Sequence, residues 1–533
     1  MARIRKTADL ARQTMLEVLR KEKIYSLDTA NSIAKLEHNS NTLFNSIENT
    51  NFSLVNEYSA ELLFECINDI FGEVSAHKKV KSKHIDILNS QLESLLTMYD
   101  SVMNYPEDSI YCLEPSHPRV EALKSCIIKK QVTSPEKSKK LFEKTQKLVS
   151  IAPAVFSKSL DFETGKVNYG KLASQAVQFY VNKKNSLDIA KHFYSLATDE
   201  QIVGVWRAID MLLSNEFTNF DFSKVKTNEL IHIPRAEKCS VLQTETQSSF
   251  GPQFSLNCQD PSRDIQLRVV NKEPLHLDSP SKRTKSYDKV IFHIHGGGFI
   301  ALSSASHQSF LSKWAKLLNV PIVSVDYRLA PEHPFPCGLD DVWQAYCWLV
   351  EQGHQILGRA PSQIIVSGES AGGNLALSMT LAAIQKGYRV PDGLLLGYPC
   401  TNLDSSRFSP SYFLTLNDVI VPHTALWTCL RSYVTDFSSF SSNPYINPLL
   451  IAQEDLAKFP PSRFFVGTMD PLYDDSLRVV EKLQQAKADV KMYEYENAMH
   501  GVFNFDNKGL VPEFRMLVND SAGCIKQMLQ SYK

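Results

Sequence analysis

Short apolar runs alternate with helix-like stretches through the second half of the chain, and this alternation constrains the fold more than any other feature. The runs are KVIFHIH, PIVSVDY, QIIVSGES, DGLLLGYP, SRFFVGTMD and DVKMYEYE. Helices are expected near residues 306–319, 338–352, 371–386 and 474–487. Because the runs lack the apolar–polar alternation of a sheet with one wet face, they predict buried parallel strands covered by helices. The predicted class is α/β with a mostly parallel central sheet.

The first half of the chain has a different period and predicts a second, mainly helical domain. From about residue 8 to 230 apolar residues recur every three or four positions, and proline and glycine mark connectors near 105–120 and 151–170. A chain of 533 residues exceeds the roughly 250 to 300 residues at which a single core stops growing. We therefore predict a helical domain at 1–235, a connecting region with a mobile charged linker at 236–288, and the α/β domain at 289–533.

Composition and charge exclude several classes of protein. The hydrophobic share of 43% and the charged share of 22% are typical of a soluble globular chain, and a net charge of -1 gives no reason to expect nucleic acid as a partner. The charged N-terminus lacks the apolar core of a secretory signal, and no apolar run reaches the roughly 18 residues of a transmembrane helix. The 10 cysteines include no C-x-x-C pair, so we expect reduced, mostly buried thiols and no zinc site. These observations predict a cytoplasmic protein.

The stretch QIIVSGESAGGNLALSM carries the most specific chemical signal. Its residues Gly368, Glu369, Ser370, Ala371 and Gly372 match G-x-S-x-G where a strand ends and a helix begins. This setting requires a sharp turn, and the two glycines remove Cβ atoms that would collide where strand and helix approach each other. The turn presents the serine hydroxyl outward, and the first N–H groups of the helix favour a developing oxyanion. Ser370 is therefore the predicted nucleophile.

A serine hydroxyl needs a general base, and the base needs an acid that orients it. Where a serine lies on such a turn, the acid and then the histidine follow it along the chain. Asp470 ends the strand in SRFFVGTMD and His500 follows the strand in DVKMYEYE, so we predict Asp470 as the acid and His500 as the base. Asp474 and Asp475 are rivals for the acid, but they fall where the next helix begins and suit its positive end.

The HGGG sequence from His295 to Gly298 predicts where the negative charge of the reaction is held. Three adjacent glycines increase the conformational entropy that is lost on folding. Their presence therefore indicates that the exposed main chain has a function here. In esterases with such a loop after an early strand, its N–H groups and the N–H after the nucleophile bind the oxyanion. We predict Gly297, Gly298 and Ala371 as these donors, with Gly296 completing the loop and His295 orienting it.

Together these motifs resemble the hormone-sensitive lipase family of α/β-hydrolases. The resemblance rests on HGGGF, DYRLAPEHPFP, GESAGGN, DPLYDD and HGVF, and the helical half, including NYGKLASQAVQFY, is similar to the N-terminal domain of animal members. It implies an α/β-hydrolase fold with a helical cap at about 402–445, and Ser370, Asp470 and His500 as the catalytic triad. It also implies lipid esters as substrates: acylglycerols, diacylglycerol above all, and cholesteryl or retinyl esters. No cofactor and no metal are implied, and lipid-droplet or membrane surfaces and a homodimer are the implied partners.

Two features depart from the mammalian pattern of this family. The segment between Leu414 and Leu450 leaves little room for the long serine-rich regulatory module of mammalian members, which puts hormone-driven phosphorylation in doubt. Glu369 stands where mammalian members tend to have aspartate, and we expect this exchange to be tolerated because it keeps the carboxylate.

Two other functions stay open on the sequence. A small-ester carboxylesterase or amide deacetylase would carry the same triad, and a non-catalytic binding protein could use the same scaffold, although the presence of His500 argues against it. Apolar residues near the cap could equally form a lipid pocket or ordinary core; they are Phe408, Tyr412, Phe413, Leu414 and Trp427.

Overall fold

The structure is a computed structural model of the chain. It describes residues 109–110, 113, 116–130, 135–159, 186–214, 225–235, 264–404, 409–416, 418–435, 442–505 and 512–531. One compact unit takes Met1–Glu121, Glu143–Val205 and Asp404–Thr428, and the other takes Ala122–Phe142, Trp206–Leu403 and Cys429–Lys533. The stretch NYGKLASQAVQFY and Phe408, which the sequence singled out, lie outside the described residues.

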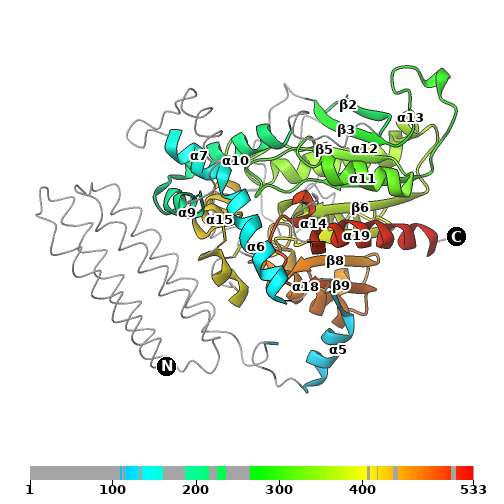
Figure 1. Cartoon of the computed structure of the whole chain (residues 1–533). Helices are drawn as coiled ribbons and strands as arrows, with labels where there is room; N and C mark the ends of the chain where they lie inside the picture. The colour runs from blue at the N-terminus through cyan, green and yellow to red at the C-terminus, as the bar shows by residue number, and fades with distance from the viewer. Residues whose placement is uncertain are drawn as a thin grey trace, which may run out of the picture. The chain divides into compact units, whose positions relative to one another are not determined.

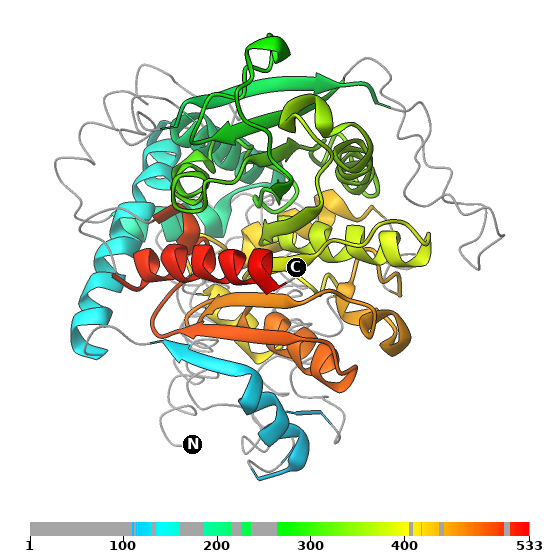
Figure 2. The same cartoon turned by 90° about the vertical axis from the view of Figure 1, so that its right-hand side faces the viewer.

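A mixed sheet forms the centre of the second unit (Figures 1 and 2). Within the described ranges its strands are β1 (Ile127–Lys130), β2 (Thr227–Ile233), β3 (Ile265–Asn271), β4 (Lys289–Ile294), β5 (Ile322–Asp326), β6 (Gln363–Glu369), β7 (Gly393–Gly397), β8 (Ser462–Gly467) and β9 (Val490–Tyr495). Their order in space is β1-β9-β8-β7-β6-β4-β5-β3-β2. All neighbours from β1 to β5 in this order are parallel, and β3 and β2 add antiparallel pairs at the far edge. The sheet is mostly parallel, as predicted.

Helices cover both faces of this sheet, which is why its central strands are almost wholly buried and mainly apolar. On one face lie α11 (Gln308–Leu318) and α19 (Pro512–Ser531), which also pack against each other (Figure 2). On the other face lie α12 (Cys337–Gln352), α14 (Ala371–Gln385) and α18 (Tyr473–Gln485). Strand β6 is buried at every position. The strands and helices predicted after residue 288 are confirmed within a few residues at their ends.

The remaining described helices are α5 (Pro118–Cys126), α6 (Pro135–Val149), α7 (Ile151–Ser159), α9 (Ser186–Leu196), α10 (Asp199–Leu213), α13 (His354–Leu357), α15 (His423–Tyr433) and α17 (Gln453–Leu456). Helix α7 corrects the sequence analysis, which assigned a connector from residue 151. Pro153 lies in the first turn of α7, where a backbone N–H has no partner within the helix, so the proline is tolerated there. Ala154 and Val155 of α7 pack on Ile189 of α9, so burial also holds this helix in place.

The sheet also contains β1, β2 and β3, which the sequence analysis did not predict as part of it. Strand β1 lies within the stretch that the three-to-four-residue period marked as helical, yet it pairs in parallel with β9. Its Ile127 and Ile128 are β-branched, and Lys130 forms a 3.2 Å ion pair with Asp520 on α19. Pairing at the sheet edge outweighs the local period here. Strands β2 and β3 likewise precede residue 289 and complete the opposite edge.

Membrane-spanning helices, metal sites and the state of the cysteines can also be examined in the structure. In the part of the chain that the structure describes, no helix is long and apolar enough to cross a membrane, and no group of histidine, cysteine or acidic residues could hold a metal ion. The described cysteines are all free thiols, and all but one are buried: Cys126, Cys337, Cys347, Cys400, Cys429 and Cys524.

Candidate active site

The G-x-S-x-G sequence forms a tight turn between β6 and α14. Ser370 has φ 56° and ψ -121°, a backbone conformation that costs roughly 1–3 kcal/mol for a residue with a side chain. A Cβ atom on Gly368 would collide with the backbone of Gly372, and one on Gly372 would collide with the carbonyl groups of Ile294 and His295. Both glycines are therefore required because the helix and two strand ends meet at this turn. The local geometry holds the Ser370 side chain away from the sheet.

The three polar residues predicted for the site lie within hydrogen-bond distance of one another. The Nε2 atom of His500 is 2.9 Å from Oγ of Ser370. The Nδ1 atom of His500 is 3.0 and 3.1 Å from the two carboxylate oxygens of Asp470. Asp470 and His500 are buried, while Ser370 is partly exposed. The rival Asp475 lies in the first turn of α18, where its carboxylate accepts hydrogen bonds from the backbone N–H groups of Thr401 and Asn402.

The surroundings of His500 favour one tautomer. A carboxylate only accepts hydrogen bonds, so Nδ1 of His500 donates its proton to Asp470 and Nε2 is left to accept the proton of the Ser370 hydroxyl. Oδ1 of Asp470 also accepts a 2.8 Å hydrogen bond from the N–H of Leu472, which fixes the carboxylate. The ring of Tyr398 packs edge-on against the His500 ring with centroids 4.6 Å apart. This arrangement can activate a serine hydroxyl as a nucleophile.

The glycine loop after β4 brings its main chain close to the same turn. Gly297 and Gly298 have φ values of 109° and 61°, which side chains disfavour. A Cβ atom on Gly297 would collide with the carbonyl of Ala301, and one on Gly298 would collide with the thiol of Cys429. Ala371 is the first residue of α14, so its N–H belongs to the first turn and has no acceptor within the helix. These are the backbone donors that we assign, as a proposal, to the oxyanion.

Two predicted supporting residues hold this loop from the inside. The His295 ring stacks on Tyr327 with centroids 4.3 Å apart, and its Nδ1 atom lies 2.8 Å from the carbonyl oxygen of Gly296. Burial lowers the pKa of His295 to about 3, so the ring is neutral. The Glu369 side chain turns inward, and its Oε1 atom accepts a hydrogen bond from the N–H of Gly296. A Cβ atom on Gly296 would be 2.9 Å from the Glu369 carbonyl oxygen, which explains the first glycine of the loop.

Arg207 supports the loop from the outside, and sequence reasoning missed it. Its Nε donates to the carbonyl of Ile300 at 3.1 Å and its Nη2 donates to the carbonyl of Ala330 at 3.2 Å. Two further bonds of 2.8 and 2.6 Å reach the carboxylate of Glu332 and lower the pKa of Glu332 to about 2. Arg207 lies on α10, 93 residues before the loop. No local pattern in the sequence connects the two.

Replacing Gly297 with alanine tests the assignment of the glycine loop. The added Cβ would meet the carbonyl of Ala301, so the loop must shift and its N–H donors move with it. Loss of one oxyanion donor costs about 10²–10³ in kcat, and we expect a fall of that size in ester hydrolysis. Gly387→Ala is the matched control, because Gly387 also has positive φ but nothing lies within 4 Å of its Cβ position. A G297A variant with the activity of G387A would contradict the assignment.

Known proteins match the chain around this site. A family model described as alpha/beta hydrolase fold matches residues 291–504. The chain is 47% identical to hormone-sensitive lipase of Mus musculus over 144 residues, which are 27% of this chain and 19% of that protein. It is 36% identical to an esterase of Acinetobacter venetianus over 235 residues, which are 43% of this chain and 70% of the esterase. The match thus spans less than a quarter of the mouse lipase and more than two thirds of the bacterial esterase.

The fold has counterparts among solved structures. A hyperthermophilic esterase from the archaeon Pyrobaculum calidifontis aligns with a TM-score of 0.50 at 24% identity. The alignment covers 64% of this chain and 97% of that chain. The likeness is one of fold: the alignment takes in nearly the whole of that esterase chain, and the remainder of this chain lies outside it.

Proposed function

This chain belongs to the α/β-hydrolase family that contains hormone-sensitive lipase, and on that premise we propose that it hydrolyses carboxylic esters of lipids by a serine mechanism. The proposed substrates are acylglycerols, with diacylglycerol preferred, and cholesteryl or retinyl esters. The observation that most supports the proposal is the hydrogen-bond path from Ser370 through His500 to Asp470, with distances of 2.9 and 3.0 Å.

The proposed reaction has two steps. His500 takes the proton of Ser370 as the hydroxyl oxygen attacks the ester carbonyl, and the N–H groups of Gly297, Gly298 and Ala371 hold the oxyanion. His500 then gives the proton to the leaving alcohol, and an acyl-enzyme remains. Water attacks the acyl group with His500 again as base, which releases the fatty acid and restores the serine. Asp470 keeps His500 in the tautomer that both steps need.

Apolar side chains pack around the glycine loop, so the proposed site lies in hydrocarbon-like surroundings. The Phe299 ring, next to Gly298, stacks on Tyr433 with centroids 3.8 Å apart. The side chains of Trp206 and Cys429 pack directly against Gly298 and leave no room for a side chain there. Of the residues weighed as pocket or core, Tyr412 and Phe413 are fully buried, and this favours core for those two.

A smaller ester is the second candidate, because the relative covered over 70% of its length is named an esterase. Initial rates on emulsified diolein and on p-nitrophenyl butyrate, measured with one enzyme preparation, separate the two functions. The lipase proposal expects a jump in the diolein rate above the solubility limit, where an emulsion surface forms. Hydrolysis of the soluble ester without hydrolysis of the emulsion would contradict the lipid substrate and leave the esterase. Association with lipid droplets and a homodimer are further parts of the proposal.

A further inference from the structure

A buried cluster of charged groups lies directly behind the proposed nucleophile, and the reaction above does not use it. Oε1 of Glu369 accepts a 2.5 Å hydrogen bond from the N–H of Gly296 and lies 2.8 Å from Nε2 of His307. Oε2 of Glu369 lies 3.0 Å from Nε2 of His293. Glu369 is only 4% exposed and immediately precedes Ser370. One carboxylate therefore joins the turn after β6 to the glycine loop, to β4 and to the start of α11.

The geometry around His307 is that of a charged imidazolium. Its Nδ1 lies 2.7 Å from the carbonyl oxygen of Ser303, which can only accept, so Nδ1 carries a proton. Its Nε2 lies 2.8 Å from Oε1 of Glu369, an ion pair by distance without the alignment of a hydrogen bond. At that distance an unprotonated nitrogen would repel the carboxylate, so Nε2 carries the second proton. Burial alone would lower the pKa of His307, but the negative charge of Glu369 beside it outweighs burial and raises the pKa. In turn, burial would raise the pKa of Glu369, yet the histidines keep it well below its usual range.

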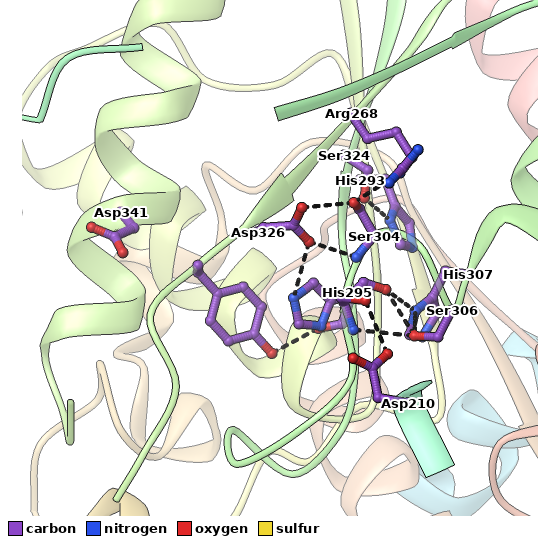
Figure 3. Close-up of polar contacts among 12 residues, drawn as sticks. Asp210, Arg268, His293, His295, Ser304, Ser306, His307, Ser324, Asp326 and Asp341 are labelled. Carbon is purple, nitrogen blue, oxygen red and sulfur yellow. Dashed lines mark hydrogen bonds and ion pairs between the residues drawn. The ribbon is translucent and has the colours of Figure 1, made fainter. Parts of the chain in front are cut away.

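The other two histidines of the cluster are neutral, so the charge of Glu369 has one partner. Burial lowers the pKa of His293 in spite of the carboxylate beside it, and its Nδ1 lies 2.8 Å from the Ser324 hydroxyl (Figure 3). Burial also keeps His295 neutral. Figure 3 shows His307 beside Ser306, with Asp210 close by. Asp210 accepts a 2.9 Å hydrogen bond from the hydroxyl of Ser303, whose carbonyl holds His307.

We propose that Glu369 and His307 are positioning residues, a buried ion pair that fastens the glycine loop to the turn carrying Ser370. The inference rests on the proposed ester hydrolysis and deepens it. The pair does not touch the substrate; it acts through the N–H of Gly296, next to the donors at Gly297 and Gly298.

The three glycines make such a fastening necessary. Glycine has the largest conformational freedom of any residue, so a loop of three would lose much order if its first N–H were not held. Oxyanion donors lower a barrier only if they are already aimed at the charge that develops, and a shift of about 1 Å can cost about 10²-fold. A neutral amide in place of Glu369 would still accept one hydrogen bond but would leave the imidazolium of His307 unpaired. The loop would then lose its alignment with Ser370.

Three variants and one inhibitor test the proposal. Glu369→Gln removes the charge at nearly constant shape, Glu369→Asp keeps the charge on a shorter side chain, and His307→Gln removes the partner. We expect E369Q and H307Q to lower kcat on p-nitrophenyl butyrate 10- to 100-fold with KM within twofold. Binding of a trifluoromethyl ketone, which forms an oxyanion on the serine, should weaken by the same factor. E369D should recover at least half of the loss on a logarithmic scale.

The control is Glu481→Gln, since Glu481 is also buried but lies on α18. The proposal is overturned if E369Q keeps the wild-type kcat, or if it loses kcat while the ketone binds as before. It is also overturned if E481Q loses as much as E369Q at equal loss of thermal stability. Should the variants not fold, ¹⁵N spectra of the wild-type histidines decide: a His307 ring that stays doubly protonated above pH 6.5 supports the ion pair, and a ring that loses a proton below that pH overturns it. Failure of the wild type to hydrolyse any ester would instead count against the proposed function.

Discussion

Replacing Ser370 with alanine is expected to lower kcat for ester hydrolysis by about 10⁶, the scale on which serine hydrolases lose activity with their nucleophile. The physical reason is that the substitution removes the oxygen that lies 2.9 Å from Nε2 of His500 and that would attack the ester carbonyl. Alanine removes only the hydroxyl oxygen. At φ 56° its backbone is no more strained than that of serine. The fold should therefore survive, and the loss should lie almost wholly in kcat.

The measurement is kcat and KM on p-nitrophenyl butyrate, together with covalent labelling by a fluorophosphonate probe. Ser362→Ala is the matched control, because Ser362 precedes β6 at its other end and is exposed. We expect full labelling and full activity of S362A, and neither for S370A. Labelling of S370A at the wild-type rate would assign the nucleophile to another serine, and wild-type turnover by S370A would remove the serine mechanism altogether.

The fold after residue 288 could be predicted because its strands are buried on both faces. Such strands are largely apolar runs separated by stretches with a helical period, so each element is visible locally. The turn around Ser370 could be predicted for the same reason, since Gly368 and Gly372 are fixed by contacts within a few residues of the serine or with one neighbouring strand.

Contacts between distant parts of the chain could not be predicted in this way. Arg207 reaches Ile300 across 93 residues, and β1 pairs with a strand more than 300 residues later. The sequence analysis treated Glu369 as a position that keeps a carboxylate but named no partner for it, and it assigned no role to His307. Only the packing of α11 beside β4 brings His307 to Glu369. Residues that meet only through tertiary packing, such as Glu369 and His307, form no motif of fixed spacing in the sequence. Residues on one turn, such as Gly368, Ser370 and Gly372, do form such a motif.

Replacing Asp470 with asparagine is expected to lower kcat by about 10⁴ while KM stays nearly unchanged, as in serine enzymes whose orienting aspartate is replaced in this way. The carboxylate of Asp470 accepts the Nδ1 proton of His500 and leaves Nε2 free to take the proton of Ser370. An asparagine amide can donate to Nδ1 instead, which moves the ring proton to Nε2. His500 would then offer Ser370 a proton where it must accept one.

Asp475→Asn is the decisive comparison, because Asp475 was the rival for the same role and is equally buried. Its carboxylate binds the N–H groups of Thr401 and Asn402, so D475N should lower the melting temperature but keep kcat within a few-fold at a temperature where it is folded. D470N should show the opposite pattern. If D475N lost more activity than D470N, the acid would have to be reassigned, and the path from Ser370 through His500 would no longer support the proposed reaction.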